Sequence, residues 1–293
     1  LAGIVTDVEV ASEFRSREPV LGPKTLAIVV TQSGETADTK AAMEYCKAKG
    51  VMTAAVVNVP TSSIARECDA VLPTLAGVEI GVASTKAFSC QLAVLAALAA
   101  HLAVVKGQMT RDEERDIVNH LTETPAALNA ALAHDEDIAA MAHLIAPARD
   151  VLYLGRGPDY PLALEGALKL KEISYIHAEG YASGEMKHGP IALIDESVPV
   201  IVLAPSGPLF EKTVSNMQEV RARGGKIVLV SDAEGIAEAG EGCMATIEMP
   251  HVHPLIAPLV YAVPVQLIAY HVACAKGTDV DQPRNLAKSV TVE

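Results

Sequence analysis

Aromatic residues are scarce in this chain: tryptophan is absent, and aromatic residues make up only 3% of the 293 positions. Half of the residues are nevertheless apolar, so a core must be built from alanine, valine, leucine and isoleucine. Such a core suits parallel strands buried on both faces and helices rich in alanine. The length allows one large domain or two of ordinary size. The composition therefore favours an α/β architecture.

Positive charge is also in short supply. The 23 lysines and arginines face 36 aspartates and glutamates, which leaves a formal net charge of -13. A nucleic acid or an anionic membrane would require a strong basic patch, and the richest basic stretch, Arg221 to Lys226, is typical of a solvated helix end. The apolar stretch from Gln91 to Val105 is short for a bilayer and contains His101, so we expect a core helix there. We therefore predict neither a nucleic-acid nor a membrane partner.

Cysteine and histidine are too scattered for a disulfide framework or a metal site. The five cysteines contain no Cys-x-x-Cys pair, which fits buried thiols in a reducing cytoplasm. His251-Val-His253 has no third ligand at a suitable spacing, so we expect no metal and no cofactor. No signal peptide is visible, and the chain opens on Leu1 rather than on methionine. We therefore expect a cytoplasmic location and a fragment of a longer protein.

Two segments of the chain follow one plan. Residues 26–57 read as a buried strand, a Ser-Gly turn, a helix closed by glycine and a second strand, and residues 200–230 repeat that order. Each is a βαβ unit, which predicts parallel strands. Residues 11–13 likewise resemble residues 182–185, at an offset of about 170 to 175 residues. We infer two α/β lobes related by internal duplication.

The repeat also sets the expected boundaries. The second lobe opens with the strand Val151 to Leu154, the turn Gly155-Arg-Gly157 and a helix, whereas their counterparts in the first lobe would fall before Leu1. The turn is either a tight packing turn or an anion loop. We expect a first lobe at 1–109 without its opening strand and helix, linking helices at 110–140, a second lobe at 141–277 and an irregular tail at 278–293.

The loop from Thr31 to Thr36 follows an apolar strand and precedes a helix. Ligands of such sheets bind beyond the carboxyl ends of the strands, and a helix N-terminus offers free amides and partial positive charge to an anion. Three hydroxyls and an amide add donors without adding charge, so the loop is a candidate phosphate site; plain N-capping is the alternative. The sister loop, Pro205 to Pro208, has lost most of these donors. The candidate residues are Thr31, Gln32, Ser33 and Thr36.

Lys169 and Glu172 are the acid–base candidates on a helix. They are three residues apart and so share one face, within a segment, Leu162 to Ile173, that is unusually apolar for a solvated helix. A surface ion pair is one interpretation. A partly buried carboxylate with a raised pKa, suited to proton transfer, is the other.

Four further positions are candidates. Val82 and Ser84 precede a helix, which they either cap or equip with ligand contacts. His188, in a polar loop before Gly-Pro, suits acid–base chemistry or is simply exposed to solvent. Lys288 lies in a tail that mixes polar and apolar residues, so the tail either docks or is disordered. A lysine in a desolvated site can form a Schiff base with a ketone.

Several motifs carry a resemblance that covers the whole chain. They resemble those of the isomerase region of the glutamine–fructose-6-phosphate aminotransferase family, whose members are also called glucosamine-6-phosphate synthases. The resemblance implies that each lobe is a sugar isomerase (SIS) domain with a flavodoxin-like α/β fold. The motifs are QSGETADT from Gln32, EIGVASTKAF from Glu79, LGRG from Leu154, ALEGALKLKEISYIHAE from Ala163, GEMKHGP from Gly184 and DVDQPRNLAKSVTVE from Asp279.

The resemblance assigns substrate contacts to two segments. The family's phosphate loop maps onto residues 31–36, with Thr31 standing where the family usually has serine and keeping the hydroxyl. Sugar contacts map onto Val82 and Ser84. A Cys-Gly-Thr-Ser loop that adds a phosphate contact in the family is absent from this sequence, so we expect the fragment alone to be incomplete.

The resemblance also implies catalytic roles. Glu172 matches the carboxylate that moves a proton between sugar C1 and C2, with Lys169 beside it. His188 matches the histidine that opens the fructose ring and reaches in from the other subunit of a homodimer. Lys288 matches the lysine that forms a Schiff base with the ketose.

The implied activity is the isomerase half of glucosamine 6-phosphate synthesis, from fructose 6-phosphate and ammonia derived from glutamine, in amino sugar biosynthesis. The N-terminal glutaminase domain of the family is absent from this sequence, which therefore could not hydrolyse glutamine. Two alternatives stay open. One is a sugar-phosphate isomerase or deaminase without an amidotransferase partner, which needs no Lys288 tail. The other is a non-enzymatic sugar-phosphate sensor, which needs neither that tail nor the Lys169 and Glu172 pair.

Overall fold

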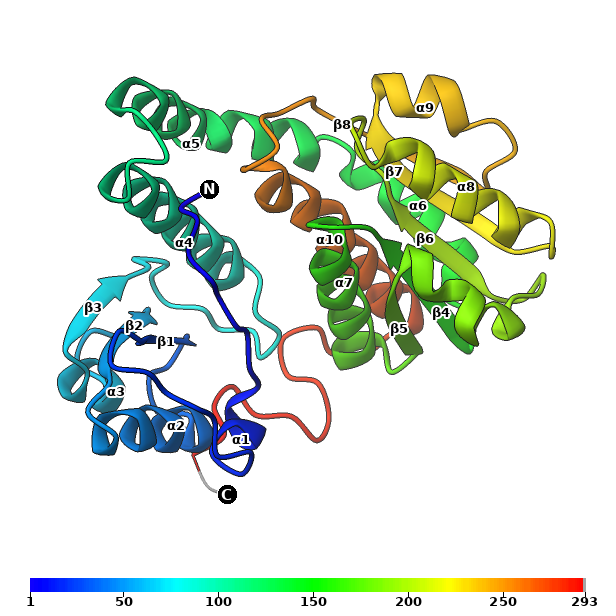
Figure 1. The fold of residues 1–293 in the computed structure, drawn as a ribbon. Coiled ribbons are helices and arrows are strands. Elements are labelled where there is room, and N and C mark those ends of the chain that lie inside the picture. Colours follow the sequence, from blue (N-terminus) through cyan, green and yellow to red (C-terminus); the bar gives the residue numbers. More distant parts are fainter. Residues whose placement is uncertain (292–293) are drawn as a thin grey trace. The chain divides into compact units, whose positions relative to one another are not determined.

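The structure is a computed structural model that describes residues 1–291. The chain forms two compact units (Figure 1). The first contains residues 1–121 together with residues 287–291, and the second contains residues 122–286. The C-terminal tail is therefore shared between the units, and its last part belongs to the first.

The first unit is built on a three-stranded parallel sheet in the order β1-β2-β3. Thr31 pairs with Val57, so β1 and β2 end at the same edge of the sheet. Beneath it, Met43 of α2 and Ile64 of α3 pack against Ala55 in a small core. The elements are α1 (Ala11–Phe14), β1 (Leu26–Thr31), α2 (Ala37–Ala48), β2 (Met52–Val57), α3 (Ser63–Glu67), β3 (Ala70–Pro73), α4 (Lys86–Val105) and α5 (Arg111–Leu132), which runs on into the second unit.

The second unit contains a five-stranded sheet in the order β5-β4-β6-β7-β8, and all of its pairings are parallel. The central strand β6 is buried along its whole length, as expected for a parallel sheet flanked by helices. The elements are α6 (Asp135–Ile145), β4 (Asp150–Gly155), α7 (Asp159–Ser174), β5 (His177–Ala182), the 3-10 turns η1 (Ser183–His188) and η2 (Pro190–Leu193), β6 (Pro199–Leu203), α8 (Phe210–Arg221), β7 (Lys226–Asp232), α9 (Ala233–Ala239), β8 (Ala245–Met249) and α10 (Ala257–Lys276).

These two sheets confirm the predicted α/β class with parallel strands flanked by helices. In the repeat, β1, β2 and β3 correspond to β6, β7 and β8. The strand β6 has β4 on its other side, whereas β1 ends its sheet, and Leu26 and Val30 on it are 45% and 43% exposed.

The segment before α1 also differs from its counterpart in the second unit. By the repeat offset, residues 6–10 are the counterpart of β5, yet they form no strand, and Val8 is 94% exposed. The strand β5 hydrogen-bonds to β4 rather than to β6. Its counterpart therefore has no neighbouring strand to pair with among residues 1–121, and an isolated strand is not stable in water.

Within residues 1–291, two helices are long and apolar enough to cross a membrane, α4 and α10. Our expectation that the first of these is too short is wrong, because the helix begins at Lys86 rather than at Gln91 and contains 20 residues. Length and composition alone are weak evidence for a membrane span. Most of α10 is buried, which is typical of a core helix.

Candidate active site

The loop after β1 is held in a tight turn. The Thr31 hydroxyl is buried and accepts a hydrogen bond from the Gly34 amide at 3.1 Å. Gly34 has a φ of +70°, and a Cβ atom there would lie 1.9 Å from the Ser62 hydroxyl. Only glycine fits this position, which brings the loop close to the start of α3.

The remaining donors of this loop lie at the N-terminus of α2. Thr36 occupies the N-cap position, but its side chain makes no capping hydrogen bond. The Ser33 hydroxyl accepts a hydrogen bond from the Glu35 amide at 3.2 Å and keeps its own proton for another partner. Plain capping by Thr36 is therefore not what this loop does. Its hydroxyls are arranged at a helix N-terminus, where an anion is favoured.

The C-terminal tail docks on this loop, within the first unit. The Ser289 and Ser33 hydroxyl oxygens are 3.0 Å apart, and the Ala37 amide donates to the Val290 carbonyl at 3.1 Å. Of the two interpretations of the tail, docking is the one found. Lys288 therefore directly precedes Ser289, the residue that contacts the predicted phosphate loop.

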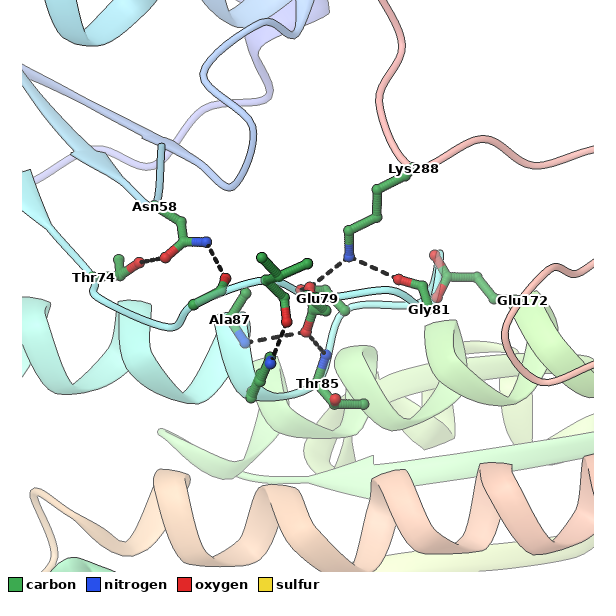
Figure 2. A network of polar contacts seen from close by, with 12 residues as sticks. Asn58, Thr74, Glu79, Gly81, Thr85, Ala87, Glu172 and Lys288 are labelled. Carbon is green, nitrogen blue, oxygen red and sulfur yellow. Dashed lines mark hydrogen bonds and ion pairs between the residues drawn. The ribbon is translucent and has the colours of Figure 1, made fainter. Parts of the chain in front are cut away.

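Lys288 is anchored by an acidic residue that lies before α4 (Figure 2). Its Nζ atom donates to Glu79 Oε2 at 2.5 Å and to the Gly81 carbonyl at 2.8 Å. The Glu79 side chain is only 5% exposed, and that of Lys288 is 27% exposed. The predicted substrate residue Ser84 joins the same cluster, because its hydroxyl donates to Glu79 Oε2 at 3.0 Å. Val82 lies between them in the loop and is half-buried.

The second unit brings Lys169 and Glu172 together on α7. Lys169 Nζ donates to Glu172 Oε2 at 2.6 Å and lies 3.7 Å from Glu165 Oε1. The side chains of Lys169, Glu172 and Glu165 are 5%, 22% and 10% exposed. The helix packs against α10 and β5, and this packing buries the lysine stem. The pair is therefore partly buried rather than a surface ion pair.

Burial raises the pKa of Glu165 to about 7, with the Lys169 ammonium opposing the shift and the Glu172 carboxylate adding to it. Glu165 Oε1 is buried and accepts no hydrogen bond from the described residues. Glu172, in contrast, lines an open hollow together with Tyr175 and Arg284. The Arg284 guanidinium lies 4.2 Å above the Tyr175 ring. Of the two carboxylates beside Lys169, that of Glu172 thus lines an open hollow and that of Glu165 is enclosed.

His188 ends η1 and is exposed, and it makes no hydrogen bond or ion pair within residues 1–291. The Gly155-Arg-Gly157 turn serves packing: a Cβ atom at Gly155 would meet the Asp159 carbonyl, and Arg156 Nη1 donates to Asn216 Oδ1 at 3.2 Å. No group of three metal-ligating side chains occurs in the part of the chain that the structure describes.

The sister loop has a different partner. Ser206, the repeat counterpart of Ser33, donates its hydroxyl to the carboxylate of Asp232, which also caps α9 through the Gly235 amide. Burial alone would raise the pKa of Asp232, but these hydrogen bonds and those from the Ser206 amide and His251 lower it overall. The hydroxyl of this second loop is therefore already hydrogen-bonded to a carboxylate of the same unit, that of Asp232.

Comparison with known proteins decides the family. Residues 1–101 and 144–276 match the family model of the SIS domain. The chain belongs to the SIS domain family. The two matched segments correspond to the two units with their parallel sheets, and the SIS repeat agrees with the duplication visible in the sequence.

Several relatives of this SIS chain are named glutamine–fructose-6-phosphate aminotransferase (isomerizing). One from Zymomonas mobilis is 72% identical over the whole chain, and one from Bradyrhizobium diazoefficiens is 63% identical. The chain spans about half the length of the curated relatives it matches, 48% in both cases.

Solved structures resemble the SIS chain as well. The C-terminal domain of glucosamine-fructose-6-phosphate aminotransferase from Francisella tularensis is 44% identical with a TM-score of 0.94, over 96% of this chain and 80% of that one. A glucosamine-6-phosphate deaminase from Thermotoga maritima has a TM-score of 0.74 over 96% of this chain and 80% of that one. At 23% identity, this second likeness shows the fold alone.

Sequence reasoning missed two residues of the SIS chain, Glu79 and Glu165. Glu79 is the single charged residue in the apolar stretch from Leu75 to Ala83, directly before a helix. A lone carboxylate in such a stretch is a signal for a buried partner. Glu165 lies four residues before Lys169, on the same apolar helix face, and that spacing was the available signal.

Proposed function

We propose that this chain is the isomerase half of a glutamine–fructose-6-phosphate aminotransferase and forms glucosamine 6-phosphate from fructose 6-phosphate and ammonia. The observation that carries the proposal is the docking of the Lys288 tail on the hydroxyl-rich loop after β1. A phosphate site beside an amine suits a phosphorylated ketose, since the amine can attack the ketone while the loop holds the phosphate. The names of the relatives support the same activity.

The loop binds the phosphate through neutral donors. Ser33 and Thr36 offer hydroxyl protons, Gln32 offers its amide, and the N-terminus of α2 adds partial positive charge. Thr31 accepts from the Gly34 amide and so holds the turn in shape, while its own proton stays available. Val82 and Ser84 contact the sugar from the loop that precedes α4.

Lys288 then attacks the C2 ketone. A carbon–nitrogen bond forms, the ketone oxygen leaves as water, and a protonated imine remains. Ammonia replaces the lysine amine at C2 and gives the imine of the sugar. Glu172 removes a proton from C1 and returns one to C2, while the C1 hydroxyl loses its proton and the nitrogen gains one. These steps convert the 2-imino sugar into the 2-amino aldose without a cofactor.

His188 opens the fructose ring before these steps. Its exposure at the end of η1 and its lack of partners within the described residues suit a side chain that serves a second copy of the chain. We infer a cytoplasmic homodimer in which each His188 completes the site of its partner, together with a glutaminase domain that supplies ammonia.

The test uses Glu172→Gln in the intact protein. Loss of the carboxylate removes the proton acceptor, so we expect kcat for conversion of fructose 6-phosphate to fall by about 10²–10⁴-fold. Affinity for fructose 6-phosphate, measured by calorimetry, should stay within a few-fold of the wild type. The matched control is Glu238→Gln, the same change at an exposed residue of α9. Normal turnover by Glu172→Gln would overturn the assignment.

A further inference from the structure

We propose that Glu79 is a positioning residue for Lys288, which it holds in the site and whose proton it carries during imine formation. The inference rests on the proposed function, because it takes Lys288 as the amine that attacks the ketone. No motif or comparison assigns a role to Glu79. Both residues belong to the first unit, so their contact is part of one compact body.

The two oxygens of Glu79 have separate tasks (Figure 2). Oε1 accepts from the amides of Thr85 at 2.9 Å and Ala87 at 3.2 Å, and so caps the N-terminus of α4. Oε2 accepts from Lys288 Nζ and from the Ser84 hydroxyl. A single carboxylate thereby connects the lysine, the proposed sugar contact Ser84 and the start of a 20-residue helix.

The loop that carries Glu79 is itself fixed on both sides. Asn58, which follows β2, accepts from the Thr74 hydroxyl at 3.1 Å and the Ala76 amide at 2.8 Å, and donates to the Gly77 carbonyl at 2.8 Å. The Lys86 ammonium donates to the Val78 carbonyl at 2.5 Å. Glu79 is therefore held by its loop as well as by the helix cap, and Lys288 is fixed to a rigid point.

The charges around Glu79 favour its ionised form. Burial alone would raise the pKa of Glu79, but hydrogen bonds from Lys288, Thr85, Ala87 and Ser84 together lower it. The Cys90 thiol on α4 is the nearby acidic group; burial raises its pKa, the negative charge of Glu79 adds to this, and the Lys86 ammonium opposes it. The resting cluster is thus a carboxylate paired with the Lys288 ammonium, the form in which lysine is not nucleophilic.

This pairing gives Glu79 its chemical task. The Lys288 ammonium passes one proton to Oε2, and the free amine attacks the ketone to form a carbon–nitrogen bond. The same proton then returns to the oxygen that was the ketone. This oxygen takes a second proton from the attacking nitrogen and leaves as water when its carbon–oxygen bond breaks. One ammonium and one ketone thereby give one protonated imine and one water, and Glu79 ends as it began.

The experiment is reductive trapping in the intact protein. Fructose 6-phosphate and sodium borohydride are added, and mass spectrometry measures how fast the Lys288 peptide gains the reduced sugar. Glu79→Gln keeps an oxygen that can cap α4 but cannot take the proton of Lys288. We expect its trapping rate to fall at least about tenfold, as for loss of a hydrogen bond between charged groups. The Kd for fructose 6-phosphate should change less than about threefold.

Two further comparisons separate positioning from a merely structural effect. Asp232→Asn is the matched control, because Asp232 is 4% exposed and caps a helix in the other unit. Its trapping rate should equal that of the wild type. In the second comparison, hydrogen exchange in the tail around Lys288 is followed in Glu79→Gln, Lys288→Gln and the double variant. The double variant should exchange no faster than either single one, because both changes break one contact.

The outcomes distinguish this inference from the function on which it rests. If the wild type traps sugar on Lys288 and Glu79→Gln traps it equally fast, the role of Glu79 is wrong and the proposed function stands. If the wild type traps nothing on Lys288, the proposed imine is wrong. In that case the exchange cycle still decides whether Glu79 holds the tail, and additive effects of the two changes would exclude it.

Discussion

Replacement of Glu165 by glutamine should make the protein more stable at high pH and leave its stability at low pH unchanged. Glu165 is 10% exposed, and burial raises its pKa from an ordinary value of 4.5 to about 7. The folded state therefore binds the Glu165 proton more tightly than the unfolded state does. Below pH 4.5 the carboxyl is protonated in both states, so Glu165 does not lower the free energy of unfolding. The loss of stability grows between pH 4.5 and pH 7 and is complete above that range.

The magnitude follows from the shift in pKa. Each unit corresponds to about 1.4 kcal/mol, so an ionised Glu165 lowers the free energy of unfolding by about 3 kcal/mol above pH 8. The amide of Glu165→Gln is neutral at every pH and avoids this cost. Burial also raises the pKa of Asp159, on the same helix, to about 7, but Asp159 is present in both proteins, so its effect is common to them. Burial raises the pKa values of the Tyr153 and Tyr261 phenols, which stay neutral across this range.

The assay is urea denaturation at pH 4.5, 6.5 and 8.5 for the wild type, Glu165→Gln and Glu238→Gln. We expect Glu165→Gln to match the wild type at the lowest pH and to exceed it by about 2–4 kcal/mol at the highest. The exposed control Glu238→Gln should differ by less than about 0.5 kcal/mol throughout. A Glu165→Gln variant whose stability advantage is the same at all three pH values would refute the reasoning.

Two other predictions concern the turn and the shared site. Gly34→Ala should lower the free energy of unfolding by about 3 kcal/mol or more in denaturant titrations, because a positive φ and a clash with Ser62 act together. The control is Gly50→Ala, at a φ of +74° with open space around it, which should lower the free energy of unfolding by about 1 kcal/mol. The second prediction tests whether His188 of one subunit serves the site of the other. Mixing inactive His188→Ala and inactive Lys288→Ala proteins in equal amounts should restore about a quarter of wild-type isomerase activity. Half of the dimers are then mixed, and each mixed dimer holds one intact site out of two. No recovery after verified subunit exchange would place both residues in one subunit.

The sequence predicted the local features of this fold well. Apolar strands followed by Ser-Gly turns and glycine-closed helices are short-range patterns, so the parallel sheets and the loop from Thr31 to Thr36 could be recognised. The spacing of Lys169 and Glu172 predicted that they share one helix face, and in the structure Lys169 Nζ lies 2.6 Å from Glu172 Oε2. These features depend on residues that are close together along the chain.

The features that sequence reasoning missed depend on distant parts of the chain. Glu79 and Lys288 are 209 residues apart, and no local pattern pairs them. Residues 6–10 have the apolar alternation of a strand but form none, because a strand depends on its neighbour. The raised pKa of Glu165 follows from packing of α7 against other elements, which spacing along one helix does not reveal.

The docked tail explains how a duplicated fold becomes asymmetric. Duplication provides two equivalent turns, one ending in Ser33 and the other in Ser206, but a polypeptide has a single C-terminal segment. In the turn that receives this segment, the Ser33 hydroxyl contacts Ser289 of the tail. In the other turn, the Ser206 hydroxyl donates to Asp232 of the same unit. The tail thus contacts the hydroxyl of one turn, while the hydroxyl of the other turn ties its own loop to the end of β7. The two lobes therefore share one repeat but differ where a single C-terminal segment contacts only one of them.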